Sequence, residues 1–104
     1  MTTSSLPIIA RSKNASGVTE FHLLADPVWD GFDSLVKYLQ KHWNAEVCEA
    51  VDNIYSRRWV LRANGVPISV YHDSQIGNYF LREDSIRDES LLENIESDLI
   101  RRLS

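Results

Sequence analysis

Cysteine, glycine and long hydrophobic runs are all scarce in this 104-residue chain of 12.0 kDa. The single cysteine, Cys48, excludes an intramolecular disulfide framework and any all-cysteine metal site, which fits a reducing compartment. No apolar run approaches the roughly 18 residues that a membrane-spanning helix needs. The first residues carry no basic leader followed by a long apolar stretch. We therefore expect a cytosolic protein that does not enter a membrane.

Motifs for cofactors and metals are also missing. The four glycines include none at the spacing of a phosphate loop or a dinucleotide fold. His22, His42 and His72 include no pair at the three- or four-residue spacing of a zinc site. Cys48 lacks the flanking sequence of a nucleophile, so we expect it to be a small buried hydrophobe. These absences predict a protein with no cofactor and no metal that is not an enzyme.

The composition, 43% hydrophobic and 25% charged, is that of one ordinary globular domain. Fifteen acidic residues against eleven basic ones give a net charge of −4, so neither nucleic acid nor an anionic membrane is an expected partner. Seven of the acids lie between Glu83 and Asp98, where Arg87 is the single base. This segment is either a solvated helix face or a surface that steers a basic partner.

The first half of the chain predicts a lead, a strand and a helix. Residues 1–17 are rich in serine and threonine, which indicates a flexible lead with a short strand at 6–10, and a single domain follows over 18–104. Residues 18–25 predict a mostly buried strand. Asp26 and Pro27 form a helix start, and Asn44 is a suitable end. One apolar stripe at helical spacing lies between them, formed by Val28, Phe32, Leu35, Val36, Leu39 and Trp43.

The second half predicts a meander and a final helix. Residues 45–52 alternate imperfectly and favour a strand, and residues 78–82 favour another. Residues 57–63 and 66–72 flank Asn64-Gly65, the preferred pair of a two-residue hairpin turn. Asp84 or Asp88 begins a helix whose apolar set is Leu91, Leu92, Ile95, Leu99 and Leu103.

The register of the predicted hairpin assigns its two faces. A two-residue turn places Trp59 opposite Val70 and Leu61 opposite Ile68 on the core side, with Pro67 in a non-hydrogen-bonded pair. The expected order β-α-β-β-β-α most simply gives a two-layer α+β fold, in which an antiparallel sheet carries both helices on one face.

The loop between the last two strands and the acidic segment after it contain the candidate binding residues. They are Asp73, Gln75, Asn78, Glu83 and Asp84. Two interpretations remain open: the polar side chains satisfy backbone amides of the turn, or they form a recognition edge for a protein partner. An acid and base pair among Asp73, Glu83 and Asp84 would need a pocket, and surface loop residues are the simpler explanation.

Aromatic and basic side chains gather around the hairpin. Tyr55, Arg57, Arg58 and Tyr71 lie on or beside one face of the predicted sheet. Such a surface can stack single-stranded bases, but the acidic total charge opposes that use. The simpler alternative is a cation-π pair between Arg58 and Tyr71.

Several local features together resemble the immunity proteins of contact-dependent growth inhibition and related polymorphic toxin systems in bacteria. They are a helix ending near Trp43, the run Ser56-Arg57-Arg58-Trp59, the Asn64-Gly65 hairpin, and Val70-Tyr71-His72-Asp73 followed by Gly77-Asn78-Tyr79. The resemblance implies a cytosolic protein that binds its cognate toxin and occludes the active site, through acidic residues where the toxin is basic. The alternatives are an assembly module that forms a homodimer through the sheet and, third, an unrecognised small enzyme.

Overall fold

The computed structural model of the protein describes residues 8–24, 29–84, 86 and 88–103. Six strands form one sheet in the order β1-β2-β6-β5-β4-β3, and every neighbouring pair is antiparallel. The elements in chain order are β1 (Ile9–Lys13), β2 (Thr19–Leu23), α1 (Trp29–Trp43), β3 (Glu46–Asp52), β4 (Ser56–Ala63), β5 (Val66–Asp73), β6 (Gly77–Arg82) and α2 (Ser90–Leu103).

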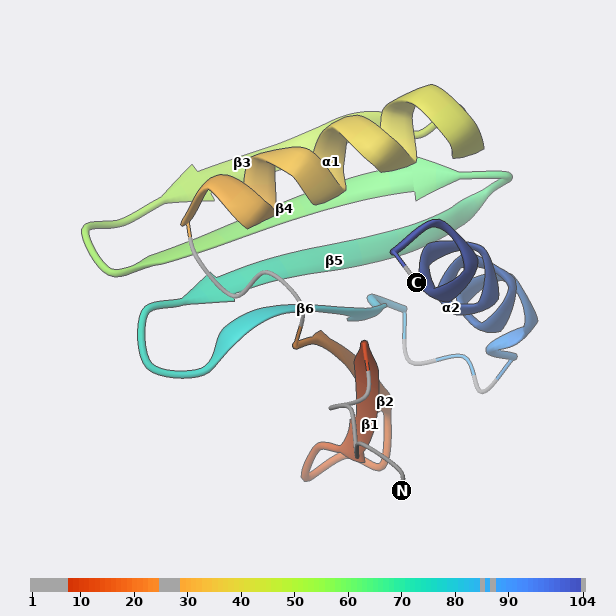
Figure 1. Cartoon of the computed structure of the whole chain (residues 1–104), viewed down its shortest axis with the longest axis horizontal. Coiled ribbons are helices and arrows are strands. Elements are labelled where there is room, and N and C mark those ends of the chain that lie inside the picture. The colour runs from red at the N-terminus through yellow and green to blue at the C-terminus, as the bar shows by residue number, and fades with distance from the viewer. Residues whose placement is uncertain (1–7, 25–28, 85, 87, 104) are drawn as a thin grey trace, which may run out of the picture.

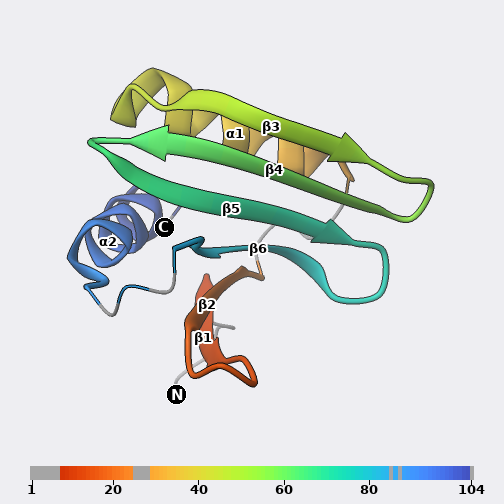
Figure 2. The same ribbon diagram turned by 180° about the vertical axis from the view of Figure 1, so that it is seen from behind.

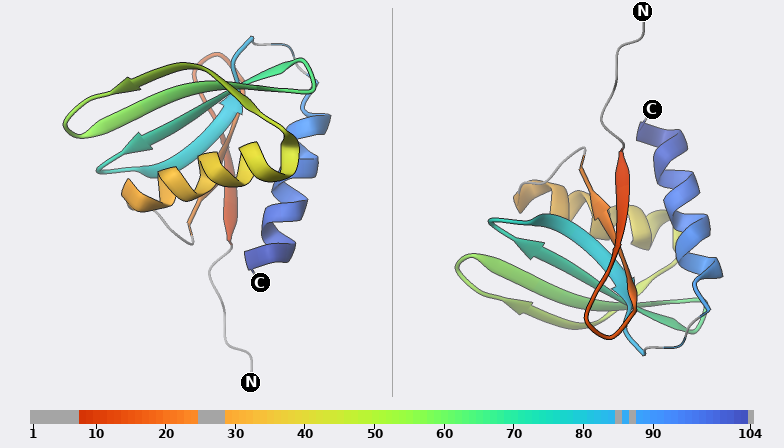
Figure 3. Two further views of the ribbon diagram at one scale, coloured as in Figure 1. Left: turned by 90° about the horizontal axis from the view of Figure 1, so that it is seen from above. Right: turned by 90° about the horizontal axis from the view of Figure 1, so that it is seen from below.

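Both helices lie on the same side of the sheet, which leaves the other face open. Figure 1 shows α1 lying across one face of the sheet, where it approaches β5 and β6, with α2 beside it near the far end of the strands. From behind, the strands lie in front of both helices (Figure 2), and the two views of Figure 3 show the sheet tilted with the helices on one side. The α+β class with an antiparallel sheet is therefore confirmed.

The end of α1 follows from local chemistry. Asn44 adopts a positive φ of 55°, and the Ala45 amide then donates to the Leu39 carbonyl at 3.2 Å, so the last carbonyls of the helix are satisfied. The predicted start at Asp26 and Pro27 lies outside the described residues. The apolar stripe is confirmed from Phe32 onward, because α1 buries Phe32, Leu35, Val36 and Leu39 and packs Trp43 against the same core, while Val28 lies outside the described residues.

The Asn64-Gly65 hairpin has the predicted register. Both turn residues adopt positive φ, 51° and 76°, and Trp59 pairs with Val70 while Leu61 pairs with Ile68. Leu61 is fully buried beneath the helices, whereas the larger Trp59 is only half-buried.

The final helix begins where one of the two predicted caps lies. Asp88 Oδ1 accepts hydrogen bonds from the Ser90 amide at 3.1 Å and the Ser90 hydroxyl at 2.7 Å. Leu92, Ile95 and Leu99 are buried in the same core as the α1 stripe, so the two helices share one apolar layer.

The N-terminal strand differs from its expected position. The strand expected at residues 6–10 forms at Ile9–Lys13 and pairs with β2, while Leu6 and Pro7 lie outside the described residues. Its first residue, Ile9, is 7% exposed, so the apolar core extends into the segment expected to be a lead.

Other boundaries and burial patterns also differ from expectation. The strand predicted at residues 45–52 is confirmed as β3, and with it four strands lie between the helices, one more than the expected order β-α-β-β-β-α counts. β2 alternates between buried and half-buried residues because only one of its faces is covered by helices. The prediction that Cys48 is buried is wrong, because it lies exposed at a register shift in the edge strand β3.

Within the described residues, neither helix has the length and apolar character required to cross a membrane.

The two faces of β4 predict unequal mutational effects. Leu61→Ala should destabilise the protein by about 2–5 kcal/mol, because it leaves a cavity in a closed core. Val60→Ala is the matched control on the open face, and it should cost about 1 kcal/mol. Urea unfolding of both variants checks this prediction, and equal losses would contradict the assignment of the faces.

Candidate protein-binding surface

The five predicted binding residues do not form one surface. Asp73 ends β5, and Gln75 lies in the following turn. Glu83 follows β6, and its amide donates to the Pro67 carbonyl at the opposite end of β5. Pro67 and Asp73 are six positions apart along this extended strand, which corresponds to about 20 Å.

Asp73 has a structural role in the turn between β5 and β6. Its Oδ1 accepts hydrogen bonds from the amides of Gln75 at 2.8 Å and Ile76 at 3.2 Å, while Gly77 has a φ of 107°. The polar loop therefore satisfies its own backbone amides, as the simpler interpretation predicted. The Gln75 side chain is exposed beside this turn.

Asn78 is a buried residue and corrects the expectation of a surface contact. It is 1% exposed, and its Oδ1 lies 2.8 Å from His72 Nδ1 on the neighbouring strand. The alternation of β6 places Asn78 on the face covered by the helices, together with Phe80. A partner at the surface would not reach it.

The acidic segment after β6 is largely neutralised within the chain. Ion pairs engage five of its seven acids: Glu83 with Arg58, Asp84 with Arg82, Glu93 and Glu96 with Arg11, and Asp98 with Arg101 and Arg102. Hydrogen bonds from Arg82 hold the pKa of Asp84 below its ordinary value. The segment consequently has far less free negative charge than its sequence suggests.

The most exposed apolar side chains lie instead at one end of the sheet, which we call the hairpin end. It comprises the turn at residues 53–55, the turn at residues 74–76 and the first turn of α1, which all lie at the same end of the molecule in Figures 1 and 2. The Ser74 amide donates to the Tyr55 carbonyl at 3.0 Å and so joins the two turns. Ile54 is 83% exposed, Tyr55 72% and Ile76 59%.

Four aspartates from three separate elements lie around this apolar group. Asp30 and Asp33 lie at the start of α1, Asp52 ends β3 and Asp73 ends β5. The single arginine among them is Arg57, which ion-pairs with Asp33 and Asp52. The hairpin end is therefore apolar at its tip and acidic around it.

Arg57 forms the base of the hairpin end. Although it is only 6% exposed, its guanidinium lies 2.8 Å from Asp33 and 3.0 Å from Asp52, and Trp59 Nε1 donates to the same Asp52 oxygen at 2.8 Å. Burial opposes the charged form, but the hydrogen bonds to Asp52 and Asp33 outweigh it and raise the pKa of Arg57.

Three aromatic rings complete this buried site. The Arg57 guanidinium lies 4.4 Å from the ring centre of Phe32, 4.5 Å from that of Trp29 and 5.2 Å from that of Trp59. The Trp29 ring also meets His72 edge-on at 5.4 Å. Because Trp29 is 38% exposed, it extends from this buried base to the surface of the hairpin end.

The expectation that Arg57 and Arg58 share a surface with Tyr71 is wrong. Neighbouring strand residues point to opposite faces, so Arg57 lies under α1 and Arg58 lies on the open face. Arg58 Nε donates to the Tyr71 hydroxyl at 3.0 Å, and its guanidinium lies 5.9 Å from the ring centre, as expected for a cation-π pair.

The open face bears a ladder of stacked rings. Tyr71 stacks on Tyr79 at 5.0 Å and 8° between planes, and Tyr79 stacks on His22 at 4.7 Å and 26°. Burial raises the pKa of Tyr79. Because these rings lie face to face with one another, the ladder does not offer them as a platform for nucleic-acid bases.

Ser12, His22 and Glu20 lie together on the open face but do not form a catalytic relay. The Ser12 hydroxyl and the Glu20 carboxylate both lie 3.1 Å from the same histidine atom, Nε2. A relay would need the serine on one ring nitrogen and the carboxylate on the other. Among the described residues, no group of three or more His, Cys, Asp or Glu side chains is arranged to hold a metal.

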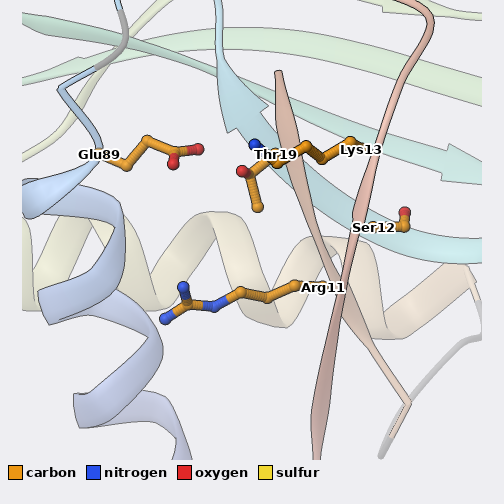
Figure 4. A pocket seen from close by; sticks show the side chains of 5 residues that line it. All are labelled: Arg11, Ser12, Lys13, Thr19 and Glu89. Carbon is orange, nitrogen blue, oxygen red and sulfur yellow. The ribbon is translucent and has the colours of Figure 1, made fainter. Parts of the chain in front are cut away.

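A pocket of about 340 Å³ lies between the β1–β2 hairpin and the start of α2 (Figure 4). Its lining consists of Arg11, Ser12, Lys13, Thr19 and Glu89. Figure 4 shows the Arg11 side chain extending toward α2, where it pairs with Glu93 and Glu96. Charges of both signs line the pocket, so it selects no class of ligand.

Sequence reasoning missed Trp29, Ile54 and Ile76. A signal was present for two of them: Ile54 and Ile76 are single large apolar residues within polar turns, where no core requires them. The proximity of the two turns is decided by strand order, which the turn sequences do not contain.

Comparison of the chain with protein-family models, with curated proteins and with solved structures finds no match in any of the three.

The ion pair between the buried Arg57 and the exposed Asp52 predicts a dependence of stability on pH. Hydrogen bonds from Arg57 and then Trp59 hold the pKa of Asp52 below its ordinary value of 3.8. Asp52 therefore stabilises the fold above pH 3.8, and this contribution is lost as the pH falls through the lower folded value. Urea unfolding of the wild type and Asp52→Asn across this range should show a stability difference that narrows with acid. A constant difference would contradict the prediction.

Proposed function

We propose that this protein is a non-enzymatic binding protein of the bacterial cytoplasm that neutralises a cognate toxin by covering it, as the immunity proteins of contact-dependent growth inhibition do. The observation that carries the proposal is the hairpin end, where exposed Ile54, Tyr55 and Ile76 lie among four aspartates. The resemblance in sequence supports the same class of function.

The apolar tip supports a protein partner. Large apolar side chains that are exposed on adjoining turns are typical of an interaction site. Interfaces also concentrate their binding energy in aromatic anchors held on a firm base. Tyr55 and Trp29 supply aromatic rings here, and Trp29 is held against the buried Arg57.

The acidic surroundings support a basic partner. Asp30, Asp33, Asp52 and Asp73 outnumber Arg57 at the hairpin end, whereas most acids of the segment from Glu83 to Asp98 are already paired. A surplus of one charge sign accelerates encounter with a partner of the opposite sign. The proposal therefore places the contact at the hairpin end and retains Asp73 and Gln75 of the five predicted residues.

Neutralisation of a toxin is the direct test. Candidate toxin domains taken from the genes that neighbour this one are expressed in a bacterial host with and without the protein, and growth is measured. We expect the wild type to restore growth and the double variant Ile54→Asp/Ile76→Asp to lose that protection, because it places charge in an apolar contact. Ile86→Asp is the matched control, since Ile86 is 53% exposed outside the hairpin end, and it should protect fully.

The outcomes test toxin neutralisation and the use of the hairpin end as the contact separately. Arrest of growth despite soluble wild-type protein contradicts toxin neutralisation. Full protection by the double variant contradicts the hairpin end as the contact, and circular dichroism shows whether each variant remains folded.

A second prediction concerns the rate of association with the toxin domain that the protein neutralises. Because exposed charges act mainly on encounter, Asp30→Lys should slow association several-fold and flatten its dependence on salt. Glu89→Lys is the control, because Glu89 precedes α2 outside the hairpin end. Surface plasmon resonance at two ionic strengths measures both rates. Equal association rates for the two variants would mean that charge at the hairpin end does not steer the partner.

A further inference from the structure

β3 is an edge strand with an unusually open environment. In the described part of the chain, β4 is its only strand neighbour. All seven of its residues are exposed, including Val47 at 39% and Val51 at 44%. Its free edge can therefore accept a further strand without displacing any described element.

The register identifies the backbone groups that point outward from β3. The two-residue turn makes Ala63 and Val66 a hydrogen-bonded pair, so by alternation Arg58 and Val60 direct their backbone groups toward β3. Their partners there are Val51 and Glu49.

The intervening residues of β3, Ala50 and Asp52, consequently direct their N–H and C=O groups away from β4. The Asn53 amide confirms the alternation, because it donates to the Ser56 carbonyl at 2.8 Å across the same pair of strands. Ala50 and Asp52 thus supply the donors and acceptors that an added strand would use.

The charge along β3 indicates which kind of strand could be added at its free edge. β3 carries three acids and no base, Glu46, Glu49 and Asp52, and the arginines next to them lie on the β4 side. A strand added at the free edge would therefore meet carboxylates directly. A second copy of β3, centred on Glu49 in antiparallel pairing, would bring like charges together, because Glu46 would face Asp52 and Glu49 would face its equivalent. A lysine- or arginine-rich strand meets the opposite charge instead.

β3 is also continuous with the hairpin end. The strand ends at Asp52, and the exposed Ile54 follows two residues later. A segment that pairs with β3 would therefore lie directly beside the apolar tip.

We propose that β3 binds an extended, basic segment of the partner protein as a seventh strand of the sheet, which rests on the proposed function for the existence of a protein partner. Main-chain hydrogen bonds to Ala50 and Asp52 hold the segment, and cationic side chains next to Glu46 and Glu49 give it selectivity.

Peptide binding tests the proposal without the toxin, so its failure and the failure of toxin neutralisation are distinguishable. A ten-residue peptide of alternating lysine and valine is titrated into isotope-labelled protein and followed by NMR. We expect saturable shifts along β3 at up to millimolar peptide, together with slower hydrogen exchange at the amides of Ala50 and Asp52. A peptide with glutamate in place of lysine should bind about tenfold more weakly or not at all.

Proline substitution removes one outward donor selectively. Ala50→Pro deletes an amide that faces away from β4, so the β3–β4 ladder remains while peptide affinity falls about tenfold. Ala50→Val is the matched control, because it keeps the amide and should bind like the wild type. The hydrogen-exchange measurement on the wild type keeps the proposal testable if Ala50→Pro does not fold.

Three results would overturn the proposal. Absence of saturable shifts in β3 at millimolar peptide would show that the edge does not accept a basic strand. Equal binding of the two peptides would show that charge does not determine which segment binds β3. Self-association of the wild type that Ala50→Pro abolishes would assign the edge to a second copy of this chain.

Discussion

The buried guanidinium of Arg57 is the constraint on which the arrangement of α1 over the sheet depends. An arginine that is 6% exposed requires paired carboxylates, because an unpaired charge in this position would cost several kcal/mol. Asp33 from α1 and Asp52 from β3 both pair with it, so this guanidinium holds the helix and the edge strand together. The rings of Trp29 and Phe32 cover the guanidinium, while the two carboxylates stay partly exposed to water.

This arrangement gives the hairpin end a firm base beneath an exposed tip. The turns at residues 53–55 and 74–76 follow strands whose ends are held by Arg57 and by the buried contact between His72 and Asn78. Side chains on a fixed base lose less conformational entropy when they bind than side chains on free loops. The same contacts that stabilise the fold therefore preorganise the proposed interface.

Ion pairs within the chain also determine where unpaired charge remains on the molecule. Arginines from several elements engage the acids after β6, as Arg58 does with Glu83 and Arg11 does with Glu96. At the hairpin end, four aspartates lie with one arginine, so net negative charge remains there for a partner. On the open face, the aromatic rings from Tyr71 to His22 stack on one another in a ladder. The proposed contacts therefore lie at an end and an edge of the sheet.

Local chemistry determined much of this fold in advance. Asn64-Gly65 set the hairpin register, Asn44 ended α1 through its positive φ, and Asp88 capped α2, because each acts on backbone groups a few residues away. The α+β class followed from the same periodicities. Tertiary structure alone decided that Asn78 is buried and that the acids after β6 are paired, since their partners come from distant strands and helices. It also placed the turn that carries Ile54 beside the turn that carries Ile76, because strand order, not the sequence of either turn, decides which turns become neighbours.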